Sequence, residues 1–146
     1  MQAEEDLKYM RLALAEAEEA GRRGEIPIGA VIVCEGRVIA RAGNATESLH
    51  DVTAHAEMQN ITAASDYLGA KYLKNCTLYV TVEPCVMCAG ALRWAQIGSV
   101  VYGASDEKGG FERYGRSLLH PKTIVKSGVL KEECTKLMVD FFKKRR

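Results

Sequence analysis

The sequence lacks the segments that would place it in a membrane or a secretion pathway. It has no run of about 20 apolar residues, which a membrane-spanning helix requires. The N-terminal stretch MQAEEDLKYM is acidic and lacks the apolar centre of a signal peptide, so we expect a cytoplasmic protein. No internal repeat, low-complexity tract or linker interrupts the chain. We therefore expect one domain over residues 1–146.

Strong basicity and an even number of cysteines are also missing. The formal net charge is +1, so the composition does not by itself indicate nucleic-acid binding. Five cysteines in a chain of this length argue against a disulfide framework and favour metal ligation or buried thiols. Positive charge is concentrated in the C-terminal run FFKKRR. Its cations could contact nucleic acid or simply form a solvated helix end.

Hydrophobic patterning indicates an α/β protein. Helical periodicity predicts helices over residues 4–22, 54–67, 85–95 and 131–145. Apolar runs predict strands over residues 26–34, 37–43, 76–82, 99–104 and 122–126, the first two forming a hairpin. The polar, glycine-rich segment 105–120 is expected to be a loop. This order predicts a mixed sheet with helices on both faces.

A pair of cysteines follows one of the predicted strands. Cys85 and Cys88 are spaced i, i+3, so both sulfurs lie on one helix face and can reach one metal ion. A helix N-terminus also stabilises thiolates, the form that binds metals. The pair alone leaves two alternatives open, a cytosolic redox motif and two buried thiols.

A histidine near the start of the preceding helix supplies a third ligand. Consecutive helices on one face of a sheet bring their N-termini to the same edge, which places His55 near Cys85 and Cys88. Three protein ligands and an open fourth position are typical of catalytic zinc. Glu57 would then move protons beside one Zn²⁺ per chain. Zinc-activated water suits the hydrolytic removal of ammonia from an aromatic amidine-like carbon.

A structural zinc site with four protein ligands is the alternative. The fourth ligand would be Cys34, Cys76 or Cys134, but none of these has a partner at ligand spacing. Each is better interpreted as a small buried hydrophobe. Iron fits this ligand set less well than zinc.

The motifs H-x-E and P-C-x-x-C together resemble the signature of zinc nucleobase deaminases. Nearly the whole chain resembles the bacterial tRNA-specific adenosine deaminases, through the stretches GEIPIGAVIV, RAGN, TAHAE, TLYVTVEPCVMCAGAL and VYGASDEKGG. This resemblance implies a cytidine-deaminase-like three-layer α/β/α sandwich with a mixed five-stranded sheet. It also implies a homodimer that converts the wobble adenosine of a tRNA anticodon stem-loop to inosine, without an organic cofactor or a membrane.

The resemblance implies roles for individual residues. His55, Cys85 and Cys88 would bind zinc, with Glu57 as the general acid and base. The implied substrate contacts are Asn44, Ile26, Pro27, Ile28, the backbone at Ala54 and Glu83, Asp106 and Lys108. For the stretch 26–28, ordinary strand core is an equal alternative.

One segment, FERYGRSLLHPK, departs from the family, which usually has a longer loop of small residues here. Its aromatic and basic side chains would stack on unpaired bases and meet phosphates, or pack on their own domain or a dimer partner. The expected RNA contacts in this loop and the C-terminal helix are Phe111, Arg113, Tyr114, Arg116, Phe141, Phe142, Lys143, Lys144 and Arg145.

Two other functions remain open. A guanine, cytosine or deoxycytidylate deaminase would share the metal site, although an all-cysteine cytidine deaminase would have cysteine at position 55. A zinc-stabilised RNA-binding module without catalysis would keep the ligands and need no Glu57. The basic C-terminus and Lys108 favour an RNA substrate.

Overall fold

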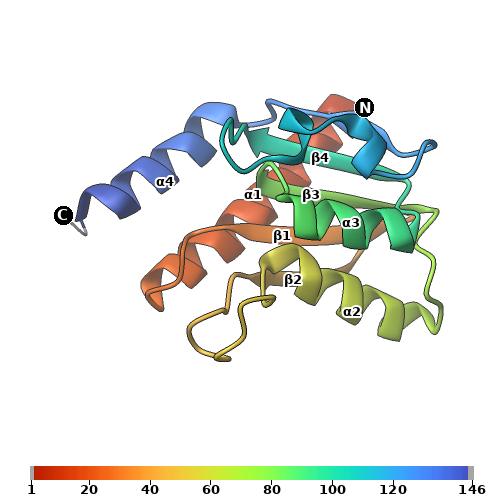
Figure 1. Cartoon of the computed structure of the whole chain (residues 1–146), viewed down its shortest axis with the longest axis horizontal. Coiled ribbons are helices and arrows are strands. Elements are labelled where there is room, and N and C mark those ends of the chain that lie inside the picture. The colour runs from red at the N-terminus through yellow and green to blue at the C-terminus, as the bar shows by residue number, and fades with distance from the viewer. Residues whose placement is uncertain (1, 145–146) are drawn as a thin grey trace.

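The computed structural model describes residues 2–144, which form one sheet covered by helices on both faces (Figure 1). The helices are α1 (Gln2–Arg22), α2 (Ala56–Leu68), α3 (Val86–Ala95) and α4 (Lys131–Lys144). The strands are β1 (Gly29–Cys34), β2 (Arg37–Gly43), β3 (Cys76–Val82), β4 (Ser99–Ala104) and β5 (Ile124–Lys126). Within this described range, no helix combines the length and apolar character needed to cross a membrane.

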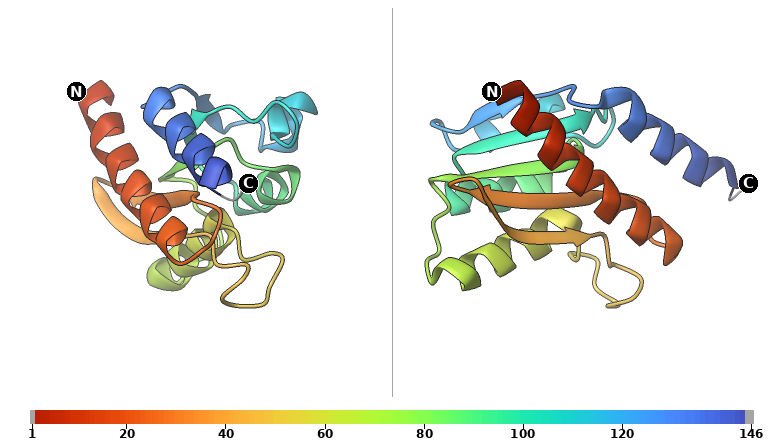
Figure 2. Two further views of the ribbon diagram at one scale, coloured as in Figure 1. Left: turned by 90° about the vertical axis from the view of Figure 1, so that its left-hand side faces the viewer. Right: turned by 180° about the vertical axis from the view of Figure 1, so that it is seen from behind.

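The sheet is mixed and has the strand order β2-β1-β3-β4-β5. Strand β1 pairs antiparallel with β2 and β3, whereas β3, β4 and β5 run parallel. Helices α2 and α3 cover one face, and α1 and α4 cover the other (Figure 2). The predicted three-layer fold with a mixed five-stranded sheet is therefore confirmed. Because α2 and α3 lie side by side and run the same way, both begin at the same end of the sheet (Figure 1).

Helix α1 packs closely on the sheet because small residues meet at the contact. A Cβ atom built at Gly29 would lie 2.2 Å from the carbonyl oxygen of Ala13 and 2.3 Å from the amide nitrogen of Ala17. Gly43 is the register partner of Gly29 on β2, and a Cβ there would lie 2.6 Å from the Glu16 carbonyl oxygen. Only glycine at these two positions lets the helix backbone approach the strands this closely.

Strand β1 begins at Gly29, so the prediction of a strand from residue 26 is wrong at its start. The Ile28 amide donates to the Ile26 carbonyl at 2.8 Å, which closes a tight turn around Pro27. Ile26 is 42% exposed, and Pro27 lines a hollow of about 480 Å³ between α1 and α4. Ile28 alone of the three packs against the core on the α2 and α3 side.

The segment 105–120 is more ordered than the predicted loop. It contains two short 3₁₀ helices, η1 (Phe111–Arg113) and η2 (Arg116–Leu118). The Phe111 side chain is fully buried, and its ring meets Tyr102 of β4 edge-on with 6.3 Å between centroids. This buried ring anchors the segment to the sheet.

Helix α4 packs on the sheet mainly through its first half. Cys134 is buried and Leu137 packs against the core on the α1 side, whereas Val139 and Phe142 are about half exposed. The ribbon views show the second half projecting past the end of the sheet where α2 and α3 begin (Figures 1 and 2). Of the predicted helix over residues 131–145, Arg145 lies outside the described residues.

Candidate metal centre and active site

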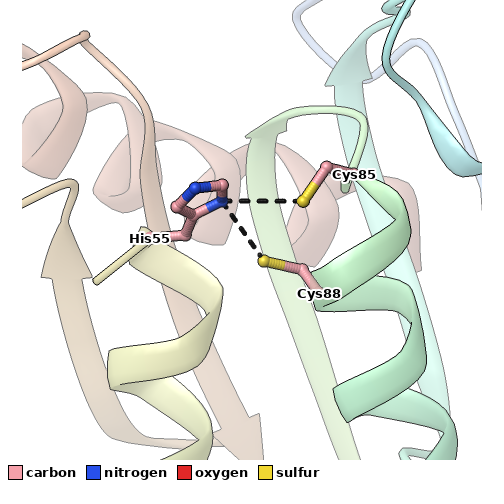
Figure 3. A group of neighbouring side chains, drawn as sticks. All are labelled: His55, Cys85 and Cys88. Atoms are coloured by element: carbon pink, nitrogen blue, oxygen red, sulfur yellow. Dashed lines mark hydrogen bonds between the residues drawn. The ribbon is translucent and has the colours of Figure 1, made fainter. Parts of the chain in front are cut away.

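Three side chains predicted as metal ligands meet where α2 and α3 begin (Figure 3). His55 and Cys85 are the N-cap residues of the two helices, and Cys88 lies in the first turn of α3. The Nδ1 atom of His55 lies 3.6 Å from the Cys85 Sγ atom and 3.5 Å from the Cys88 Sγ atom. The extended backbone of both N-caps directs their side chains beyond the helix ends and toward each other.

These distances fit a zinc ion. Tetrahedral bonds of about 2.3 Å to sulfur and about 2.0–2.1 Å to nitrogen place a ligand nitrogen roughly 3.5 Å from a ligand sulfur. Two thiolates and an imidazole are ligands that zinc prefers. Among residues 2–144, no other group of three or more His, Cys, Asp or Glu residues is arranged to hold a metal. His55 and Cys85 are only half-buried, so the cluster is partly exposed to solvent.

The two thiols of the site differ in their protonation. A hydrogen bond from Cys88 lowers the pKa of Cys85 to about 5 despite burial, and the first amide groups of α3 act in the same direction. The same hydrogen bond, together with burial, raises the pKa of Cys88. The pair therefore holds one proton, and a metal ion that displaces it would bind two thiolates.

Glu57 lies beside these thiols in the first turn of α2 and is 4% exposed. Burial raises the pKa of Glu57 to about 7, against the lowering effect of its own backbone amide, and the negative charge of Cys85 raises it further. A carboxyl group with a pKa near neutrality can both accept and release a proton. The structure thus places a carboxyl group of this kind beside the three clustered side chains.

Asn44 is held against the start of α2. Its Oδ1 atom accepts a hydrogen bond of 2.9 Å from the Ala56 amide, and the side chain is almost fully buried. Ala54, the second predicted substrate contact in this region, has a carbonyl that already accepts hydrogen bonds from the Ala45 amide and Gln59 Nε2. Both residues therefore fix the approach of the preceding loop to the metal ligands.

A buried carboxylate that the sequence analysis missed supports the same loop. Glu25 accepts hydrogen bonds from the Glu47 amide at 3.1 Å and the Ser48 amide at 2.8 Å. These bonds hold the segment 44–53 that leads into His55. The partners lie more than twenty positions away in the sequence, and a single acidic residue before Ile-Pro carries no pattern that predicts them.

Glu83 organises a second loop through its side chain, not only its backbone. One carboxylate oxygen accepts the Asp106 amide at 3.0 Å, and the other accepts the Glu112 amide at 2.9 Å. Gly110 lies against this carboxylate, because a Cβ there would be 2.2 Å from it. The Asp106 carboxylate in turn accepts the Lys108 amide, so the predicted substrate contacts 106 and 108 share one turn.

We expect Glu83→Gln to loosen this loop. The new amide group would face a backbone N–H donor, and an unsatisfied buried donor costs about 1–3 kcal/mol. The midpoint of urea unfolding should fall, and KM for the substrate should rise more than kcat falls. Glu107→Gln is the matched control, because Glu107 is exposed on the same loop. Equal effects of the two substitutions would contradict this role for Glu83.

The residues predicted to contact RNA in the segment 111–116 differ in their exposure to solvent. Phe111 is fully buried, which favours the alternative that this side chain packs on its own domain. Tyr114 is 59% exposed, with the Arg113 guanidinium 5.8 Å from its ring centroid. Arg116 is exposed and forms an ion pair of 2.8 Å with Glu112.

The predicted contacts at the end of α4 lie on its projecting half. The Phe141 and Phe142 rings meet edge-on with 5.3 Å between centroids. Lys143 and Lys144 are exposed in the last turn of the helix. These four side chains therefore form an aromatic and basic tip beyond the end of the sheet that carries the metal ligands (Figure 1).

Comparisons with known proteins agree with this geometry. The model of the MafB19-like deaminase family matches residues 4–146. The tRNA-specific adenosine deaminase of Agrobacterium fabrum is 47% identical over 143 residues, which cover 94% of each chain. A solved structure from a study of A-to-I editing by tRNA:A34 deaminases at the wobble position is 47% identical, with a TM-score of 0.83, and the match covers 89% of this chain and 98% of that one.

A guanine deaminase of Bacillus subtilis is also similar in structure. It is 42% identical, with a TM-score of 0.64, over 67% of this chain and 63% of that chain. The match is shorter than those to the tRNA-specific enzymes, which extend over nearly the whole chain. The chain therefore belongs to the MafB19-like deaminase family and, within it, to the bacterial tRNA-specific adenosine deaminases.

Proposed function

We propose that the chain converts adenosine to inosine at the wobble position of tRNA by hydrolytic deamination. The observation that carries this proposal is the cluster of His55, Cys85, Cys88 and Glu57 at the start of two parallel helices. The substrate class is supported by relatives named tRNA-specific adenosine deaminases, which match over nearly their full length. In this proposal the chain acts as one domain, in the bacterial cytoplasm where tRNA is found.

The cofactor in this proposal is one Zn²⁺ per chain and no organic group. When bound by His55, Cys85 and Cys88, zinc would make a strong oxygen nucleophile available at neutral pH for attack on purine C6. Glu57 would hold the proton taken from water, deliver it to the purine ring nitrogen and then assist the departure of ammonia. Asn44, fixed through its Oδ1 atom, would orient the base with its amide nitrogen.

The RNA would lie across the end of the sheet from which α4 projects. Tyr114 would stack on an unpaired base, and the α4 tip would meet the phosphate backbone. Asp106 and Lys108, in the turn held by Glu83, would border the same surface. These roles follow from exposure and charge on the side of the molecule that carries the metal ligands.

The lysines of the α4 tip provide a test of this surface. We expect Lys143→Ala with Lys144→Ala to weaken binding of an anticodon stem-loop and to reduce the slope of log K against log salt by about 0.7 per lysine. Lys71→Ala with Lys74→Ala is the charge-matched control, since these exposed lysines lie between α2 and β3 at the other end of the sheet. Fluorescence anisotropy over a salt series measures the slope. An unchanged slope in the α4 variant would show that these lysines do not contact RNA and form only a solvated helix end.

We further propose that two copies associate through α3. Its outer face exposes Trp94 by 82% and Val86 by 47%, two turns apart, and the same helix carries two of the metal ligands. A second copy there would stand beside the metal centre. We expect a dimer in sedimentation equilibrium, and a monomer after Trp94→Glu. Val139→Glu, on an exposed face of α4, is the control and should leave the dimer intact. A monomeric wild-type chain would contradict this interface.

The position of the edited base tests the substrate. We expect the zinc-loaded chain to form inosine in a stem-loop RNA whose adenosine occupies the first anticodon position. A matched RNA with that adenosine moved one nucleotide along the loop should react at least tenfold more slowly. Sequencing of the product locates inosine, since it pairs as guanosine. Equal reaction of the two RNAs would overturn wobble specificity, and no reaction of any amine-bearing base would favour a non-catalytic RNA-binding module.

A further inference from the structure

Two cysteines outside the metal centre face each other across the sheet. Cys34 ends β1 and Cys76 begins β3, and the two are direct partners in the antiparallel register. Side chains of direct partners lie on the same face of a sheet. Here both belong to the face covered by α2 and α3, where Cys76 is part of the core and Cys34 packs against it.

The hydrogen-bond pattern makes this a closely spaced pair. The Gly29 amide points toward β3, where it donates to Thr81 Oγ1. Amides of successive residues in a strand point to opposite sides, so the Cys34 amide, five positions along β1, points toward β2. The Cys76 amide donates to the Leu73 carbonyl at 3.1 Å, away from Cys34. Cys34 and Cys76 are therefore a non-hydrogen-bonded pair, for which the Cα atoms lie about 4.5 Å apart and the side chains approach closely. That separation is within the range of about 4.4–6.8 Å found in disulfides.

The two thiols differ in their access to solvent. Cys34 is half-buried and lines a hollow of about 490 Å³ together with Glu35, Tyr72 and Cys76. Cys76 is 2% exposed. Burial raises the pKa of the Cys76 thiol to about 12, and the adjacent Cys34 thiol acts in the same direction. A small oxidant entering the hollow therefore meets Cys34 first, with Cys76 as the resolving thiol.

We propose that Cys34 and Cys76 form an oxidisable pair that closes to a cross-strand disulfide when the protein meets a peroxide. The Cys34 sulfur attacks one peroxide oxygen, the O–O bond breaks, and a sulfenic acid and one water are formed. The Cys76 sulfur then attacks the Cys34 sulfur, the S–O bond breaks, and a second water leaves with the Cys76 proton. In total, two thiols are oxidised to one disulfide, and one hydrogen peroxide is reduced to two waters.

This site is separate from the metal centre. Strand β3 has seven residues, which span roughly 20 Å between Cys76 at its start and the turn that leads to Cys85. A link at the start of the strand leaves the three metal ligands and Glu57 in place. The proposal therefore does not depend on which base the chain deaminates.

Peptide mapping of the zinc-loaded full-length chain tests the pair. Hydrogen peroxide is added, free thiols are alkylated without reduction, and the chain is cut with trypsin and chymotrypsin. Cleavage after Tyr79 is needed because it separates Cys76 from Cys85 and Cys88. We expect a linked pair of peptides containing Cys34 and Cys76, lighter by two hydrogens than the two free peptides and split by dithiothreitol.

Three variants control the assignment. Cys34→Ser and Cys76→Ser should each lose the linked peptides, whereas Cys134→Ser, which removes another buried thiol, should keep them. Zinc content of each variant shows whether it has folded. A wild-type chain in which Cys34 and Cys76 stay alkylatable, at a peroxide dose that oxidises a thiol peptide in the same tube, would overturn the proposal. So would a link formed instead by Cys85 or Cys88.

Discussion

Glu57→Gln should lower the rate of inosine formation by about 10²–10⁴-fold, the usual contribution of a general acid and base. Glutamine has the size of glutamate but cannot accept and return a proton. Because Glu57 is not one of the three clustered ligands, the variant should bind zinc and anticodon stem-loop RNA as the wild type does. Single-turnover kinetics, zinc analysis and RNA binding measure the three properties separately.

Asp66→Asn is the matched control for this substitution, since it changes an exposed carboxylate on the same helix. It should retain the wild-type rate. A Glu57→Gln variant that keeps the full rate would show that another group moves the proton. A variant that loses zinc together with activity would instead place Glu57 among the ligands.

Cys88→Ala should remove most of the bound zinc and reduce deamination below detection. Cys88 is fully buried and supplies one of the three clustered ligands. Once its sulfur is removed, no neighbouring side chain can take the vacant ligand position. The remaining thiolate and imidazole hold zinc much less tightly than a complete set. Inductively coupled plasma analysis gives the zinc content, and inosine formation is measured in the same preparation.

Cys134→Ala controls for the loss of a buried thiol, because Cys134 belongs to α4 and lies outside the metal cluster. It should bind one zinc per chain and remain active, with some loss of stability from the cavity. A Cys88→Ala variant with a full complement of zinc would show that the metal is held elsewhere.

The metal cluster could be predicted from the sequence because the cysteine spacing and the order of helices both place the ligands at the same end of the sheet. The spacing of Cys85 and Cys88 puts both on one face of the helix that follows β3, and His55 begins the preceding helix on the same face of the sheet. Parallel helices on one face must begin at the same end. The order of elements therefore brings the ligands together before any contact is known.

The surroundings of the cluster could not be predicted in the same way. The ring of Phe111 is buried because Tyr102 and the core of the sheet accept it, and its own segment reads as a polar loop. Glu25 and Glu83 are buried because backbone amides more than twenty positions away need acceptors. Such long-range hydrogen bonds leave no periodic pattern in the sequence.

At the start of the first strand, the apolar pattern alone gave the wrong boundary. The apolar run from Ile26 looks continuous, but Pro27 has no backbone N–H group to donate a hydrogen bond. The chain turns sharply between Ile26 and Ile28. The strand begins at Gly29, where α1 touches the backbone. Only Ile28 of this stretch then faces the layer that holds the metal ligands.

An RNA substrate and a free base distinguish adenosine deamination in RNA from free-base deamination. The most direct test compares, under identical conditions, the zinc-loaded chain on an anticodon stem-loop with a wobble adenosine and on free guanine. We expect inosine in the RNA and no xanthine from guanine. Xanthine from guanine, with the RNA unchanged, would contradict this expectation and assign the chain to free-base deamination.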